Sequence, residues 1–258
     1  MRRMTPTTVK RTAKVGGCEI YYIELGEGPN LVFLHGSGGP RFDETSFGLL
    51  AQNYRLHVPS MPGFDQSTVG PVTSGPEIAG VMAQLIASLP GGRAHVVGES
   101  FGGRIAAWLT VRHPEVVDRA VLAAPGGLRR GGGDRGLDLT PDERYMRLYG
   151  RKPDHQPTPE EEAVHRANVG NAIRFGGPAW DEDLYQQLPT IRRPVLVLYG
   201  TNDQTLARPD IELFHERIPD SRISCLEGAP HVLSASRPEQ FVSLVRGFLD
   251  EERDGSRE

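Results

Sequence analysis

A serine in a glycine-flanked turn is the residue of this chain best placed for nucleophilic chemistry. Ser100 lies at the centre of the sequence Gly-Glu-Ser-Phe-Gly, residues 98–102, after the apolar run 94–97 and before a helical stretch that begins near Phe101. A serine with a glycine two residues away on each side, between a strand and a helix, is the pattern of a nucleophile elbow. We expect both glycines because side chains there would collide with neighbouring backbone in so tight a turn.

An aspartate and a histidine further along the chain could activate this serine. Asp203 comes just past the continuous apolar run 194–199, which is typical of a buried parallel strand. His231 follows residues 223–226, which predict a last strand. A histidine can take the proton of an attacking serine, and a carboxylate can hold the other ring N–H of that histidine. We therefore predict that Ser100, His231 and Asp203 are the catalytic residues.

A glycine-rich turn upstream could bind the oxygen of a reacting carbonyl. The apolar run 31–34 is followed by His-Gly-Ser-Gly-Gly at residues 35–39. Such a turn leaves backbone N–H groups unpaired, and one of them can act with the N–H of the residue after the nucleophile. We assign the two oxyanion-hole donors to Ser37 and Phe101, and we expect His35 to support the turn by hydrogen bonding.

The elements that must position these residues alternate between strand and helix. This alternation predicts an α/β fold, with a mostly parallel central sheet and helices on both faces. Residues 77–89 carry apolar side chains at the i, i+3, i+4, i+7 spacing of an amphipathic helix, and residues 101–113 continue the serine turn as a helix. For the last helix, Ser236 with Glu239 three residues later predicts an N-cap and a capping box.

One region interrupts the alternation. Residues 128–187 are polar and contain no good strand, but they predict two helices, at 141–148 and 159–175. Residues 129–136 are rich in glycine and arginine and predict a flexible loop. We therefore divide the chain into a core, residues 1–127 and 188–258, and an insertion, residues 128–187.

Composition excludes several classes of function. The chain has 258 residues, 38% of them hydrophobic, and 29 Lys and Arg against 33 Asp and Glu give a net charge of −4. This length can form a sizeable core, and so mild a charge gives no reason to expect nucleic acid or an anionic membrane as partner. We expect a small-molecule substrate instead.

Neither a metal nor a cofactor is expected. Cys18 and Cys225 are far apart in the sequence, and the histidines lack metal-ligand spacing. No G-x-G-x-x-G sequence follows a strand, so a dinucleotide is not implied. The polar start of the chain lacks the apolar core of a signal peptide, and no apolar run approaches the roughly 18 residues of a membrane span. We expect a cytoplasmic protein.

These motifs together resemble the α/β-hydrolase superfamily, in its smaller serine-nucleophile form with a helical cap. The likeness runs from about Tyr21 to Asp250, and the chain order Ser, Asp, His is that of the superfamily. Residues 59–67 are similar to the P-G-F-G-x-S loop of the family, and residues 123–127 to the loop where its cap begins. Asp65 stands where the family usually has glycine. We expect it to be a solvated turn residue, with contact to substrate as the alternative.

The resemblance implies roles for the insertion and for one buried acid. In the family a helical cap covers the nucleophile at this point of the chain, so residues 128–187 would be a cap that sets substrate choice. Its candidates for substrate contact are Tyr145, Met146, Tyr149, Phe175 and Trp180. For each of them the alternative is packing of the cap against the core. Glu99 would lie buried beside the nucleophile, with a structural or substrate-shaping role.

The function predicted is that of a serine hydrolase that cleaves a carboxylic ester, lactone or thioester of a small molecule through an acyl-enzyme. A first alternative is hydrolysis of a carbon–carbon bond in a diketone-like substrate. It is less favoured, because such enzymes tend to carry H-G-G-G-P-G and G-N-S-x-G, where this chain has H-G-S-G-G and G-E-S-F-G. A second alternative is a non-hydrolytic member of the fold, such as a lyase, a cyclase or a ligand-binding receptor.

Overall fold

A mostly parallel sheet runs through the centre of the molecule in the computed structural model, which describes residues 8–40, 44–130 and 138–251. Within these residues the sheet has eight strands, in the order β1-β2-β4-β3-β5-β6-β7-β8. The strands are β1 (Val9–Val15), β2 (Cys18–Leu25), β3 (Asn30–Leu34), β4 (Arg55–Pro59), β5 (Ala94–Glu99), β6 (Val117–Ala123), β7 (Val195–Gly200) and β8 (Ser221–Leu226). β2 pairs antiparallel with β1 and β4, and every other pairing is parallel.

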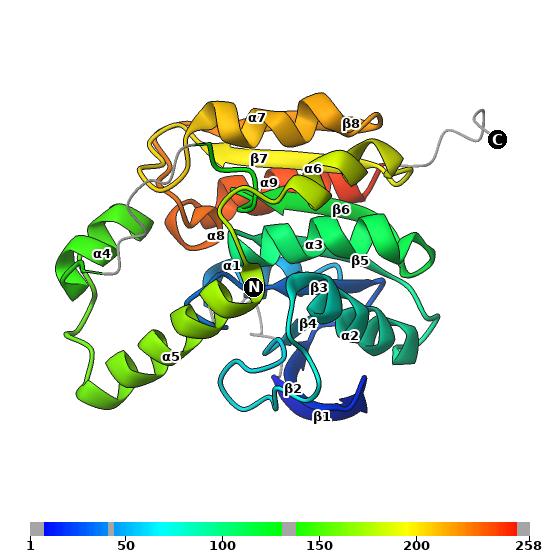
Figure 1. Cartoon of the computed structure of the whole chain (residues 1–258), viewed down its shortest axis with the longest axis horizontal. Helices are drawn as coiled ribbons and strands as arrows, with labels where there is room; N and C mark the ends of the chain where they lie inside the picture. The colour runs from blue at the N-terminus through cyan, green and yellow to red at the C-terminus, as the bar shows by residue number, and fades with distance from the viewer. Residues whose placement is uncertain (1–7, 41–43, 131–137, 252–258) are drawn as a thin grey trace, which may run out of the picture.

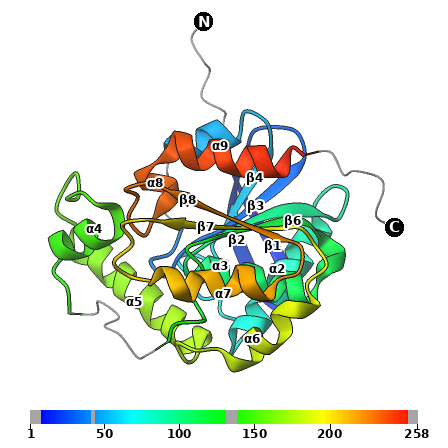
Figure 2. The same ribbon diagram turned by 90° about the horizontal axis from the view of Figure 1, so that it is seen from above.

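Helices cover both faces of this sheet, which confirms the α/β fold expected from the sequence. The helices are α1 (Glu44–Leu50), α2 (Gly75–Ser88), α3 (Phe101–Arg112), α4 (Pro141–Tyr149), α5 (Pro159–Gly176), α6 (Glu182–Gln187), α7 (Arg208–Arg217), α8 (Leu233–Ser236) and α9 (Pro238–Leu249), with short 3-10 turns at Pro114–Val116 and Leu188–Thr190. Helices α1, α8 and α9 lie on one face, and α2, α3, α6 and α7 lie on the other (Figures 1 and 2). No helix in the described part of the chain is long and apolar enough to cross a membrane.

The central strands are apolar along their whole length because both of their faces are covered. Strands β3, β5, β6 and β7 are almost entirely buried, whereas β1, at the edge, is mostly exposed. One core layer packs α2, α3 and α7 against the sheet around Trp108 and Phe214. The other packs α1 and α9 around Phe47 and Phe241. The continuous runs at 31–34, 94–97 and 194–199 are thus the signature of strands buried on both sides.

The last helix begins later than the sequence suggested. Ser236 ends α8, and α9 starts at Pro238 with Arg237 as a cap residue that makes no side-chain cap bond. The capping box expected between Ser236 and Glu239 is therefore wrong. The reason is Pro238, because proline favours the first position of a helix and keeps the residue before it out of the helical region.

The two helices expected between β6 and β7 lie where the sequence placed them. Each starts with proline and has a complete capping box, Thr140 with Glu143 in α4 and Thr158 with Glu161 in α5. The only regular β pairing in the described part of residues 128–187 is a single bridge between Leu128 and Trp180. Both helices lie at the end of the sheet where α8 lies (Figures 1 and 2). Most of the expected flexible loop, residues 131–136, falls outside the described residues.

A buried ion pair fastens the end of this insertion to the core. The carboxylate oxygen Oδ2 of Asp181 accepts hydrogen bonds from Arg104 Nε (3.1 Å), Arg104 Nη2 (2.6 Å) and Trp108 Nε1 (3.0 Å). Its other oxygen caps α6 by accepting from the N–H of Leu184 at 3.0 Å. Arg104 and Asp181 are 7% and 8% exposed. Each charge therefore depends on the other for compensation inside the protein.

Two buried histidines are held neutral by the fold. His35 donates from Nδ1 to the carbonyl of Gly36 (2.8 Å), and its Nε2 accepts from the N–H of Met61 (3.1 Å). Burial lowers the pKa of His35 to about 4, since the surroundings disfavour a charged ring. Burial likewise lowers the pKa of His57 to about 4, although Glu24 opposes the effect. The two hydrogen bonds of His35 confirm that it supports the turn at residues 36–39.

Removing Asp181 should destabilise the protein strongly. In Asp181→Ala the guanidinium of Arg104 stays buried without its counter-charge, so the free energy of unfolding should fall by roughly 3 to 5 kcal/mol. The measurement is urea unfolding followed by circular dichroism. The control is Asp183→Ala, which removes an exposed carboxylate of the same helix and should cost less than about 1 kcal/mol. Equal losses in the two variants would contradict the role given to the buried pair.

Stability should fall between neutral and acid pH because of the two histidines. In the unfolded chain a histidine titrates near about 6.5, so from there down to pH 4 the unfolded state takes up protons that folded His35 and His57 exclude. The free energy of unfolding therefore increases as pH rises from 4 to about 6.5. The stability that the two neutral histidines contribute is lost as pH falls through this window. His35→Gln removes one of these protons, so it should reduce the slope of the free energy of unfolding against pH by about 1.4 kcal/mol per pH unit.

The test is urea unfolding at a series of pH values between 4 and 7. His57→Gln gives an independent second variant with the same expected effect on the slope. His155→Gln is the matched control, because the side chain of His155 is 72% exposed. A slope in both buried-site variants equal to that of the wild type would disprove the assignment.

Candidate active site

Ser100 occupies a strained turn between β5 and α3. Its backbone φ is +58°, a left-handed value that is rare for residues other than glycine. The backbone around it is fully bonded, because the N–H of Ser100 donates to Ala123 O (2.9 Å) and its carbonyl accepts from Arg104 N (3.2 Å) and Gly126 N (3.0 Å). Strain of this kind persists only where the surroundings hold it.

The glycines of the elbow are required by close backbone contacts. A Cβ on Gly98 would overlap the carbonyl oxygen of Gly102, and a Cβ on Gly102 would overlap the carbonyl oxygen of Leu34. The collision expected from the sequence is therefore with the neighbouring turn of α3 and with the end of β3. A side chain at Gly98 would push α3 away from β5, and one at Gly102 would push α3 away from the end of β3.

The loops that carry Asp203 and His231 are joined to each other beyond the ends of β7 and β8. The N–H of Asn202 donates to Ala229 O (3.0 Å), and the N–H of Gly228 donates to Thr201 Oγ1 (2.8 Å). Gly200 lies so close to the carbonyl of Ala229 that no side chain would fit there. Adjacent parallel strands thus present both residues at the same edge of the sheet.

Ser100, His231 and Asp203 form one hydrogen-bonded chain. The hydroxyl of Ser100 lies 2.8 Å from Nε2 of His231, and Nδ1 of His231 lies 2.7 Å from Oδ2 of Asp203. The side chains of His231 and Asp203 are 3% and 2% exposed. With Nδ1–H donating to the carboxylate, Nε2 is free to accept the serine proton, the arrangement that general-base activation of a serine needs.

The carboxylate of Asp203 is stabilised in its charged form. Burial, the largest single effect, would raise the pKa of Asp203, but His231 and the backbone N–H groups of Leu206 and Thr205 together bring the pKa below its usual value. Its second oxygen, Oδ1, accepts from the N–H of Thr205 (2.7 Å) and of Leu206 (3.0 Å). These two bonds fix the carboxylate plane, so its other oxygen stays directed at the histidine.

A buried acid fixes the chain on the other side of His231. Glu99 is 5% exposed and accepts two hydrogen bonds from Ser234, one from its N–H (3.0 Å) and one from its hydroxyl (2.8 Å). Burial raises the pKa of Glu99, against the opposing effects of these bonds and of His231. The residue before the nucleophile is therefore tied to the third residue after the histidine. The family resemblance implied a buried Glu99, but the sequence carried no signal for Ser234.

The two assigned oxyanion donors lie beside the serine. Gly36 approaches so closely that a Cβ built on it would be 3.5 Å from the Cβ of Ser100, which places the turn containing Ser37 against the nucleophile. Phe101 is the first residue of α3, so its N–H is not used by the hydrogen bonds of that helix. The structure brings both residues to Ser100, and their role as donors stays a prediction.

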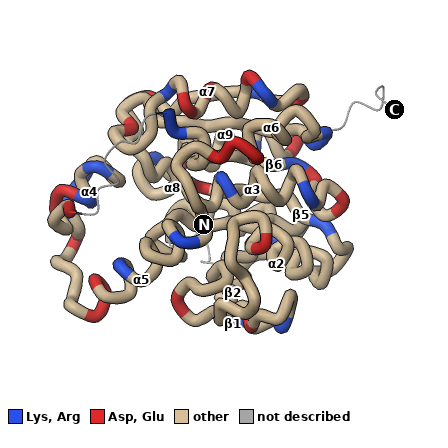
Figure 3. Tube along the Cα trace, viewed as in Figure 1, with Lys and Arg blue, Asp and Glu red and all other residues tan. Residues whose placement is uncertain are grey.

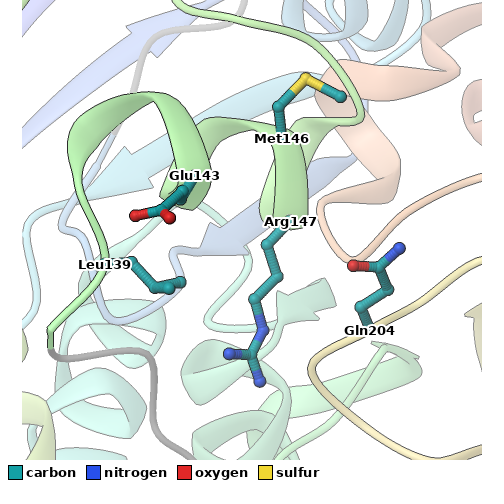
Figure 4. Close-up of a pocket in the computed structure, with 5 residues that line it drawn as sticks. All are labelled: Leu139, Glu143, Met146, Arg147 and Gln204. Carbon is teal, nitrogen blue, oxygen red and sulfur yellow. The ribbon is translucent and has the colours of Figure 1, made fainter.

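A groove opens between α4 and the loop after β7. It has a volume of about 580 Å³ and is lined by Leu139, Glu143, Met146, Arg147 and Gln204. Arg147 extends from α4 alongside Gln204, the residue that follows Asp203 (Figure 4). Helix α4 is attached to the histidine loop, because the N–H of Val232 donates to Leu148 O at 2.8 Å. Acidic and basic residues are interspersed along α4 (Figure 3).

The residues expected to face a substrate occupy different surroundings. Tyr145 and Tyr149 stack on α4 with ring centroids 5.1 Å apart, and Met146 is 48% exposed at the groove. Phe175 is 2% exposed and belongs to the core layer. Trp180 packs 5.0 Å from the ring of Tyr185 and donates to Glu182. Tyr145, Met146 and Tyr149 belong to the helix that bonds the histidine loop, and substrate contact stays a prediction for all five residues.

Comparison with known sequences places this chain in a family. The model of the alpha/beta hydrolase family matches residues 31–244. A pimeloyl-[acyl-carrier protein] methyl ester esterase of Aeromonas salmonicida is 29% identical over 254 residues, which cover 87% of this chain and 97% of the relative. A 2-hydroxy-6-oxo-6-(2'-aminophenyl)hexa-2,4-dienoic acid hydrolase of Metapseudomonas resinovorans is 26% identical, over 96% of this chain and 93% of the relative.

Solved structures share the same architecture. Carboxylesterase CesB of Bacillus subtilis superposes with a TM-score of 0.77 at 21% identity, over 94% of this chain and 92% of that one. A serine hydrolase involved in carbazole degradation gives a TM-score of 0.77 at 22% identity, over 95% and 99% of the two chains. These likenesses show the same fold, and the family match over residues 31–244 shows that the chain belongs to the alpha/beta hydrolase family.

Proposed function

We propose that this enzyme is a serine hydrolase that cleaves a carboxylic ester, lactone or thioester of a small molecule through an acyl-enzyme. The observation that carries the proposal is the continuous hydrogen-bonded chain from Ser100 Oγ to His231 Nε2 (2.8 Å) and from His231 Nδ1 to Asp203 Oδ2 (2.7 Å). Serine, base and orienting acid with these atoms in contact are the requirement for acyl transfer to a hydroxyl group.

The proposed reaction has two similar halves. Ser100 Oγ attacks the carbonyl carbon while its proton moves to His231 Nε2, and the N–H groups of Ser37 and Phe101 bind the negative oxygen of the tetrahedral intermediate. The intermediate collapses to an acyl-serine, and the departing alcohol or thiol takes the proton from His231. Water then attacks the acyl group, gives a proton to His231 in turn, and releases the acid as Ser100 regains its hydrogen.

Residues 128–187 are proposed to be a cap that shapes the substrate site. The contact between Val232 and Leu148 supports this role, since it attaches α4 directly beside His231. The groove between α4 and Gln204 supports it further, because it opens next to the Asp203 loop. Its apolar side chains, Leu139 and Met146, favour an acyl chain or an apolar alcohol. The name of the Aeromonas relative makes methyl esters of acyl chains the first substrates to test.

Replacing the nucleophile should abolish ester hydrolysis. Ser100→Ala removes the only atom that can form the acyl-enzyme, so kcat should fall by about 10⁶-fold towards the background rate. The measurement uses p-nitrophenyl and methyl esters of graded acyl length, and the preferred length reports the size of the groove. The control is Ser88→Ala, because the hydroxyl of Ser88 bonds to Leu85 O within α2. Hydrolysis that survives in Ser100→Ala would disprove the proposal.

Carbon–carbon bond hydrolysis is the second candidate. The hydrolase of Metapseudomonas resinovorans supports it, since its name describes a substrate with a keto group beside a dienoic acid. The same experiment separates the two reactions when a 2-hydroxy-6-oxo-dienoic acid is included among the substrates. A wild-type enzyme that is inert towards every ester but active on this acid would replace the ester proposal with this one.

A further inference from the structure

One buried residue of α5 is an asparagine where the pattern of the helix calls for an apolar side chain. The buried residues of α5 are Asn168, Ala172, Phe175 and Gly176, at the i, i+4, i+7, i+8 spacing of a helix stripe that faces a core. Asn168 is 3% exposed. Burying an amide costs free energy unless it is hydrogen-bonded, so its partners indicate what the residue is for.

The amide of Asn168 joins two loops that border the nucleophile. Its Nδ2 donates to the carbonyl of Gly38 (3.1 Å) and to Oδ1 of Asp65 (2.8 Å). Its Oδ1 accepts from the backbone N–H of Asp65 at 3.3 Å. Asp65 is thus held through both its backbone and its side chain, which explains how it keeps a left-handed φ of +44°. Asp65 is the exposed turn residue expected from the sequence, and its bonds to Asn168 hold it in place.

The turn from Gly36 to Gly39 is clamped from two sides. On one side His35 donates to the carbonyl of Gly36, which also accepts from the N–H of Gly39 at 3.2 Å. On the other side Asn168 bonds the carbonyl of Gly38 and covers Gly39, where a Cβ would lie 3.1 Å from the Cγ of Asn168. The N–H of Ser37 lies between these two attachments.

We propose that Asn168 is a positioning residue, which sets the oxyanion turn of Gly36–Gly39 from the insertion helix α5. Docking of α5 and alignment of the Ser37 N–H are then one event, linked through a single amide group. The inference rests on the proposed function, because it gives Asn168 a role only where Ser37 binds an oxyanion. Its consequence is that loss of Asn168 weakens binding of the transition state more than binding of the substrate.

The first test separates kcat from KM in Asn168→Ala. Misplacement of an oxyanion donor by a fraction of an ångström should lower kcat roughly 10-fold to 100-fold, with little change in KM. The affinity for a trifluoromethyl ketone of matched acyl length should fall by the same factor, because its adduct with Ser100 places an oxyanion in the hole. A variant with unchanged kcat and unchanged inhibitor affinity would overturn the proposal.

A matched control lies one helical turn away. Asn171 donates from its Nδ2 to the carbonyl of Gly63 at 2.6 Å, so it attaches α5 to the loop of Asp65 without touching the oxyanion turn. Asn171→Ala should loosen the helix but keep kcat within about twofold of the wild type. Equal losses of kcat in the two variants would show that helix docking alone is responsible and would reject the specific role of Asn168.

An exchange of the two side chains tests which bond matters. The double variant Asp65→Asn/Asn168→Asp restores an amide–carboxylate contact between α5 and the Asp65 loop, but it leaves the carbonyl of Gly38 without its donor. The thermal midpoint should recover relative to Asn168→Ala, while kcat should stay low. Recovery of kcat would disprove the role of the Gly38 bond.

Failure of this inference is distinguishable from failure of the proposed function. If Ser100→Ala retains ester hydrolysis, the serine mechanism itself is wrong. If hydrolysis depends on Ser100 but is indifferent to Asn168, the mechanism stands and the positioning role alone is rejected.

Discussion

The close approach of three backbone segments around Ser100 is the constraint on which the rest of the structure depends. The end of β3, the end of β5 and the first turn of α3 come together without room for a side chain at Gly98 or Gly102. This contact holds Ser100 at an unfavourable φ and brings the turn after β3 against the nucleophile. The covered faces of the sheet provide the stability that such strain requires.

Much of this arrangement could be predicted from the sequence because it is encoded locally. Strands buried on both faces leave continuous apolar runs, and the turns at their ends carry the candidate site residues. The carboxyl ends of parallel strands lie at the same edge of the sheet. Ser100, Asp203 and His231, which each follow such a strand, could therefore be expected close together. The oxyanion turn follows from the same logic, since glycines after a strand mark backbone that approaches something closely.

The contacts that the sequence could not indicate are single polar pairs between distant segments. Glu99 and Ser234 are 135 residues apart, and Asn168 and Asp65 are 103 apart. Serine and asparagine occur throughout the chain, so neither has a local pattern that reveals its partner. Local pattern also failed at Ser236, where a capping-box spacing was overridden by the ring of Pro238. Substrate contact by the insertion depends on how helices lie over the core, which composition does not determine.

The bond between Ser100 and His231 spans 131 residues of chain. Their strands, β5 and β8, are not neighbours, because β6 and β7 lie between them in the sheet. Three consecutive strand pairings therefore bring the two side chains to the same edge of the sheet, where the bonds between Glu99 and Ser234 also hold them. A chain that has formed only part of its sheet can hold a correct elbow and a correct histidine loop and still be inert. The meeting of Ser100 and His231 in this architecture therefore requires that strands β5 to β8 are all paired.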